Sequence, residues 1–173
     1  MRIKGEVVRL KQDDNINTDY IISGRYKFHI ENPDELAKHI FEDLEPNFIK
    51  RLGSRSIIVA GYNFGCGSSR EQAPLALKYA GIRVIIAKNF ARIFYRNAFN
   101  LGLLLIETET DNIKDKDLVE IDVDRGRLKN KTQGFEQDIK PLPGFMKQIL
   151  KEGSIIDYLN KSHTFLLPKD TRE

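Results

Sequence analysis

Residues 56–81 of the chain read SIIVAGYNFGCGSSREQAPLALKYAG, and this stretch indicates the fold more strongly than any other. It begins with Ser56–Ala60, a short continuous apolar run that is typical of a strand buried on both faces of a parallel sheet. A glycine-rich segment follows, and then Arg70–Tyr79, whose apolar residues recur at helical spacing until Gly81 ends the pattern. The stretch therefore predicts a strand, a tight turn and a helix in succession.

The same alternation continues downstream. Arg83–Ala87 reads as a second buried strand, Ala91–Asn100 as a second helix ended by Gly102, and Leu103–Ile106 as a third strand. Strand–helix–strand–helix–strand with short apolar strands favours a parallel sheet covered by helices.

Other segments add to this centre. The pattern predicts a strand at Ile3–Leu10, a polar turn at Lys11–Asp19, a helix from Pro33 to Leu44 capped by Asn32, a short helix at Asn47–Leu52, a half-exposed strand at Asp117–Asp124 and a helix at Gly144–Asn160 weakened by Gly153. We therefore expect one α/β domain over residues 1–173, with central parallel strands, helices on the faces and antiparallel additions.

Composition narrows the class of protein. The chain has 173 residues, of which 40% are hydrophobic, so it can bury a core of its own. Its 28 Lys and Arg against 25 Asp and Glu leave a charge of +3 without a basic run, so we expect no nucleic-acid partner. The charged N-terminal segment lacks the apolar stretch of a signal peptide, and no apolar run approaches the ~20 residues of a membrane span. We expect a cytoplasmic protein with no membrane partner.

Cysteine and histidine are scarce. The chain has a single cysteine, Cys66, which can form no internal disulfide and cannot supply the three or four thiolates of an iron–sulfur cluster. Its histidines, His29, His39 and His163, lack the spacing of a metal site. The sequence predicts no metal or cofactor bound by this chain, and any metal chemistry would require a metal held by another chain.

Two interpretations fit the glycine-rich turn. In the first interpretation, free N–H groups where the turn meets the helix form an anion site. Arg70 opposes the helix dipole, so its presence there is better explained if its guanidinium binds a carboxylate. Alternatively, Ser68 and Glu71 form a capping box and the glycines only allow the turn. The turn lacks the lysine of a P-loop and the pattern of a nucleophile elbow, and Ser68 has no identifiable triad partner.

The segment Asn63-Phe-Gly-Cys-Gly-Ser-Ser-Arg-Glu-Gln-Ala-Pro74 resembles the signature of the aconitase superfamily's swivel domain in its stand-alone form, the small subunit of 3-isopropylmalate dehydratase and homoaconitase. Asp14–Asp19 and the residues after it look like the opening motif of that family. The similarity extends from residue 1 to about 165. It implies a swivelling β/β/α domain of the aconitase C-terminal type.

The resemblance also implies a reaction. Members of this family isomerise a malate-type acid by dehydration and rehydration, with a [4Fe-4S] cluster on a large subunit as the Lewis acid. By position, Ser68 is the catalytic base, and Ser69 and Arg70 contact a substrate carboxylate; Ser69 could also cap the helix. We therefore expect the small subunit of a hydro-lyase that acts on a small di- or tricarboxylic acid and is inactive without the large subunit.

Substrate choice in the family depends on the loop that is Tyr26–His29 in this chain. Homoaconitases have an arginine at its third position and isopropylmalate enzymes an apolar residue; this chain has Phe28. The leading interpretation is therefore a 3-isopropylmalate dehydratase of leucine biosynthesis. Lys27 could present a charge to a further carboxylate or be a solvated surface residue, so a homoaconitase of lysine or 2-oxoacid elongation pathways and a dimethylmalate-type dehydratase stay open.

Two alternatives come from other classes of protein. The same turn could serve a non-catalytic anion- or RNA-binding module, although the sequence has no RRM pattern. It could also belong to a self-sufficient hydrolase built on Ser68. Cys66 is interpreted as a small buried residue. Asp19 is interpreted as a turn residue whose carboxylate accepts backbone hydrogen bonds, with a role in the active site as the alternative.

Overall fold

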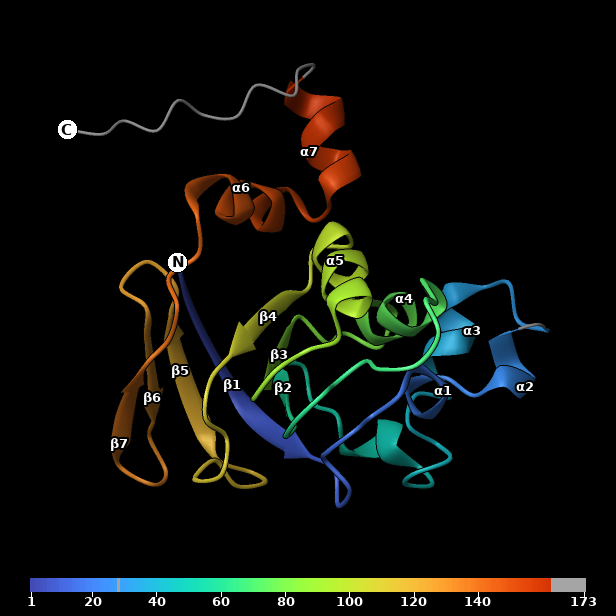
Figure 1. The fold of residues 1–173 in the computed structure, drawn as a ribbon, viewed down its shortest axis with the longest axis horizontal. Coiled ribbons are helices and arrows are strands. Elements are labelled where there is room, and N and C mark those ends of the chain that lie inside the picture. Colours follow the sequence, from blue (N-terminus) through green and yellow to red (C-terminus); the bar gives the residue numbers. More distant parts are fainter. Residues whose placement is uncertain (28, 163–173) are drawn as a thin grey trace.

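The computed structural model describes residues 1–27 and 29–162, in which seven strands form one sheet with the order β4-β3-β2-β1-β5-β6-β7 (Figure 1). The parallel strands are β1 (Arg2–Arg9), β2 (Ser56–Val59), β3 (Val84–Ala87) and β4 (Leu104–Glu107). The antiparallel strands are β5 (Leu118–Asp122), β6 (Arg127–Asn130) and β7 (Phe135–Asp138). The predicted parallel centre with antiparallel additions is confirmed.

Strand β1 joins the two halves of the sheet. One edge pairs in parallel with β2, with Val7 opposite Ile57, and the other edge pairs antiparallel with β5, with Ile3 opposite Ile121. This eight-residue strand therefore lies between the parallel strands and the antiparallel strands of the sheet.

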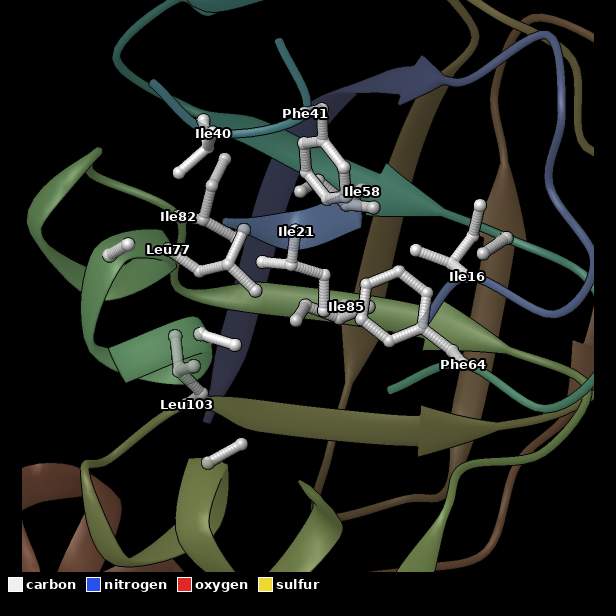
Figure 2. Close-up of a cluster of buried hydrophobic side chains, with 14 of the residues drawn as sticks. Ile16, Ile21, Ile40, Phe41, Ile58, Phe64, Leu77, Ile82, Ile85 and Leu103 are labelled. Carbon is white, nitrogen blue, oxygen red and sulfur yellow. The ribbon is translucent and has the colours of Figure 1, made fainter. Parts of the chain in front are cut away.

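Strands β2 and β3 are buried along their whole length, and consecutive residues of each strand point to opposite faces of the sheet. Ile58 and Ile85 face one core together with Ile21, Phe64 and Leu77 (Figure 2). Their neighbours on the same strands face a second core that also contains residues of β5 and β6. This burial explains why these strands appear in the sequence as unbroken apolar runs.

Helices and short turns complete the structure. They are α1 (Thr18–Ile21), α2 (Gly24–Lys27), α3 (Pro33–Ala37), the 3-10 turn η1 (Phe48–Arg51), α4 (Gln72–Tyr79), α5 (Arg92–Asn100), α6 (Gly144–Glu152) and α7 (Ile155–Ser162). Helices α1 to α4 lie together beside the parallel strands, whereas β5 to β7 lie at the other end of the sheet (Figure 1). No helix in the described part of the chain is long and apolar enough to cross a membrane.

Two predicted helices were wrong in extent. The helix that begins at Pro33 ends at Ala37 instead of Leu44, and Phe41 lies beyond it in the left-handed region at φ 55°. Phe41 is fully buried and its N–H donates to the carbonyl of Ile21, so the helical spacing of apolar residues there reflected burial in the core. The helix predicted for 144–160 is two helices, because Gly153 ends α6 at φ 100°.

Candidate functional site

The glycine-rich turn is held against the loop that precedes α1. The N–H of Gly61 donates to the carbonyl of Asp13 at 2.8 Å, and the N–H of Gly65 donates to the carbonyl of Ile16 at 2.7 Å. The N–H of Thr18 in turn donates to the carbonyl of Cys66 at 2.8 Å. Two motifs about 50 residues apart in the sequence therefore form one backbone unit, which the sequence could not specify.

Close packing explains two of the glycines. Gly65 has φ 78°, and a Cβ built there would lie 2.1 Å from the Phe94 side chain of α5. A Cβ at Gly61 would lie 1.9 Å from Oδ1 of Asp14, which accepts a hydrogen bond from the N–H of Tyr62. The turn is thus wedged between α5 and the loop at 13–18.

Ser68 and Ser69 stand at the open end of this turn. A cavity of about 300 Å³ lies beside them, lined also by Thr18, Arg70 and residues 91–94. The Thr18 hydroxyl donates to the carbonyl of Ser68 at 3.0 Å, which fixes the Ser68 backbone while leaving its side chain exposed. Among the described residues, neither serine hydroxyl has a hydrogen-bond partner, so both are available to a ligand in the cavity.

The capping-box interpretation was wrong. Helix α4 begins at Gln72, and its N-cap is Glu71, which makes no side-chain capping hydrogen bond. Ser68 therefore lies outside the helix, where its hydroxyl caps nothing, and Arg70 likewise precedes the first helical turn.

Arg70 already binds a carboxylate within the chain. Its guanidinium donates to the carboxylate of Asp19 in α1, and the Arg70 side chain is only 22% exposed at the cavity wall. This ion pair is a further bridge between the two motifs. Asp19, interpreted from sequence as a turn residue, instead contacts the predicted carboxylate-binding arginine.

The helix that begins at the cavity is α5, whereas the sequence pointed to α4. The lining includes Ala91, the N-cap of α5, and Arg92–Phe94, its first turn, but no residue of α4. Arg92 was not among the predicted site residues. A cation at the first residue of a helix opposes the helix dipole, and that signal, applied only to Arg70, could have identified Arg92.

The predicted specificity residues are not tested by this geometry. Lys27 ends α2, but its side chain and the whole of Phe28 lie outside the described residues. Cys66 is partly exposed and not fully buried as interpreted, and desolvation raises the pKa of its thiol, which makes it a poor nucleophile. Its one thiol does not fit an iron–sulfur cluster, and the described residues contain no group of three potential metal ligands among His, Cys, Asp and Glu.

Comparison with known proteins places the site in a family context. The family model of the aconitase C-terminal domain matches residues 6–111, which include both halves of the site. A 3-isopropylmalate dehydratase small subunit 1 of Archaeoglobus fulgidus is 53% identical over 86% of this chain and 92% of its own length. One from Thermotoga maritima, also named small subunit 1, is 52% identical over 94% of this chain and 98% of its own.

A solved structure agrees with these relatives. The crystal structure of a 3-isopropylmalate dehydratase from Methanocaldococcus jannaschii superposes with a TM-score of 0.87 at 45% identity, covering 94% of this chain and 96% of that one.

Proposed function

The chain belongs to the aconitase C-terminal domain family, and from this membership we propose that it acts as the small subunit of a heteromeric hydro-lyase, a 3-isopropylmalate dehydratase of leucine biosynthesis. Relatives at about 50% identity over most of the chain carry that name, which supports the substrate. The enzyme would move the substrate hydroxyl to the neighbouring carbon by dehydration and rehydration. We further propose that residues 1–173 act as one domain.

The observation that carries this proposal is the cavity that brings Ser68, Ser69 and Arg70 together at the surface. A guanidinium grips a carboxylate through two parallel hydrogen bonds, and Arg70 already pairs with the carboxylate of Asp19. A substrate carboxylate could take over part of this interaction, and the free hydroxyl of Ser69 could donate to the same group.

Ser68 is the proposed base. Dehydration takes a proton from the carbon beside a carboxylate, leaves the electron pair in a new double bond and expels hydroxide from the next carbon. A serine hydroxyl is too weak an acid to ionise in water, so the Ser68 alkoxide would need the Arg70 charge and nearby backbone N–H groups in a site closed from solvent. The Thr18 hydrogen bond holds the Ser68 backbone in place for this transfer.

The large subunit is the proposed second half of the site. Departure of hydroxide needs a Lewis acid, which a [4Fe-4S] cluster on the large subunit supplies. The present chain has a single cysteine, Cys66, so its part is the base and the carboxylate contacts. An oxygen-sensitive partner and a single cysteine suit a reducing compartment, and we place the enzyme in the cytoplasm.

Phe28 and Lys27 are the proposed specificity residues. An apolar ring at Phe28 favours the isopropyl arm of the substrate. Lys27 would favour a further carboxylate, as in homocitrate, and a dimethylmalate-type substrate would also suit Phe28.

The test is anaerobic assembly of the chain with a large subunit of 3-isopropylmalate dehydratase. Formation of the alkene is followed by absorbance with isopropylmalate, homocitrate, citrate and dimethylmalate in separate reactions. We expect turnover of isopropylmalate by the pair and none by either subunit alone. Turnover by this chain alone, or preference for homocitrate, would contradict the proposal, and salt-sensitive RNA binding without turnover would favour a binding module.

A further inference from the structure

Arg92 occupies an electrostatically unfavourable position in the fold. It is the first residue of α5, where the unsatisfied N–H groups and the helix dipole are positive. The N-cap, Ala91, has no side-chain acceptor, and the first turn contains no acidic residue. Nothing within this helix end compensates the charge of the arginine.

No other described residue compensates it either. The Arg92 guanidinium makes no hydrogen bond or ion pair in the part of the chain that the structure describes, and its side chain is exposed. Arg70, on the same cavity, pairs with Asp19. The cavity therefore has one arginine that is already paired and one whose charge is unmatched.

The two arginines line one cavity of about 300 Å³, together with Ser68, Ser69 and the first turn of α5. This volume is at the lower end of the range for small-molecule sites, roughly 300–1,000 Å³. Two arginine residues and a helix N-terminus bordering so small a cavity would suit a ligand with two negative charges.

We propose that Arg92 is a second carboxylate-binding residue, which holds the substrate carboxylate that Arg70 does not contact. The inference rests on the proposed function, because it assumes a dicarboxylic acid in this cavity. It assigns the two ends of the substrate to separate elements, Arg70 to the glycine-rich turn and Arg92 to α5. The reacting carbons would then lie between them, beside Ser68.

A role in substrate binding predicts a distinct kinetic pattern. Loss of the proton delocalises negative charge into the carboxylate beside the deprotonated carbon, which is the one assigned to Arg70. The carboxylate assigned to Arg92, on the hydroxyl-bearing carbon, keeps the same charge in substrate and transition state, so Arg92 stabilises both equally. Losing it should raise KM and leave kcat nearly unchanged. A merely structural role at the start of α5 would disturb the packing of Phe94 against Gly65 and lower kcat through the Ser68 turn.

The experiment compares Arg92→Met with Arg96→Met in the assembled enzyme. Arg96 lies one turn further along α5; both arginines line a neighbouring cavity of about 440 Å³, but only Arg92 also lines the one beside Ser68. We expect R92M to raise the KM for isopropylmalate and the inhibition constant for succinate, a plain dicarboxylate, each by about tenfold, or about 1.4 kcal/mol. R96M should leave both constants unchanged, and Arg92→Lys should restore part of the loss.

Unchanged KM and inhibition constant in R92M would overturn the inference, as would a lower kcat at unchanged KM. If R92M does not assemble, R92K gives the same comparison with a smaller rise in KM, and no rise would be equally decisive. Wild-type enzyme without turnover of isopropylmalate would contradict the proposed function itself, whereas active wild type with a normal R92M would contradict only the role of Arg92.

Discussion

Thr18 is the residue on which the position of Ser68 most directly depends. Its hydroxyl donates to the Ser68 carbonyl at 3.0 Å, its N–H donates to the carbonyl of Cys66, and its side chain is 2% exposed. It therefore acts on the turn through the Ser68 backbone.

Thr18→Val removes this hydroxyl at nearly constant volume. We expect the free energy of unfolding to fall by about 1 kcal/mol, the usual net contribution of one hydrogen bond. The kcat of the assembled enzyme should fall by up to about fivefold, because the Ser68 backbone is no longer fixed. Urea unfolding and steady-state kinetics measure the two effects. Thr18→Ser keeps the hydroxyl and is the control; an equal loss of kcat in both variants would refute this role.

For single residues, the sequence motif predicted that Ser68, Ser69 and Arg70 lie together in one site, and the structure places all three on one cavity. The pairing of Arg70 with Asp19 joins residues 51 positions apart, and such a contact leaves no local signal in the sequence. Arg92 does leave a local signal, because it is a cation at the start of a helix. Only the fold shows that it lines the same cavity as Ser68.

The contact between the glycine-rich turn and α5 is the critical one among the elements. Gly65 adopts φ 78° and has no room for a Cβ, whereas Gly81, at the end of α4, adopts φ 85° with no atom within 4 Å of a built Cβ. The two positions share the backbone strain and differ in the clash with Phe94.

Gly65→Ala should therefore cost more stability than Gly81→Ala. We expect Gly81→Ala to lower the free energy of unfolding by about 1–2 kcal/mol, the cost of a left-handed alanine. Gly65→Ala should lower it by about 3 kcal/mol or more, because overpacking adds to that strain. Urea denaturation of both variants provides the comparison; equal losses would show that the turn is not wedged against α5.

Among the elements, strands β2, β3 and β4 were predictable because burial on both faces leaves an unbroken apolar run. The segment after Pro33 was not, because Leu36, Ile40 and Phe41 are all buried in one core although the helix ends at Ala37. Apolar spacing reports which residues face the core, and a compact turn can present them as well as a helix can.

Over the whole molecule, Asp117 links the two halves of the sheet. Its backbone carbonyl accepts from Val7 of β1, and its carboxylate accepts from Asn130 at the end of β6 at 2.7 Å and from Gln133 at 2.9 Å. Burial acts to raise the pKa of this carboxyl, but the hydrogen bonds from Gln133, Asn130 and the Lys114 amide outweigh it and lower the pKa.

A lowered pKa makes the stability depend on pH in one direction. The ionised Asp117 stabilises the fold above the pKa of the unfolded chain, near 3.8, and this contribution is lost as pH falls through the lower folded pKa. Asp117→Asn should cost about 2 kcal/mol at pH 7, and the gap to wild type should narrow below pH ~4. Asp138→Asn, at an 83% exposed side chain, is the control and should change little. A gap that does not depend on pH would contradict this account.

The central claim about the molecule is that it carries half of an active site, with Ser68 as the base. The direct measurement is the kcat of Ser68→Ala assembled with the large subunit, beside wild type in the same anaerobic preparation. The Ser68 hydroxyl is exposed and has no hydrogen-bond partner in the described residues, so assembly and stability should stay at wild-type levels. We predict that kcat for isopropylmalate falls by about 10²–10⁴-fold; full activity in the variant would show that Ser68 is not the base.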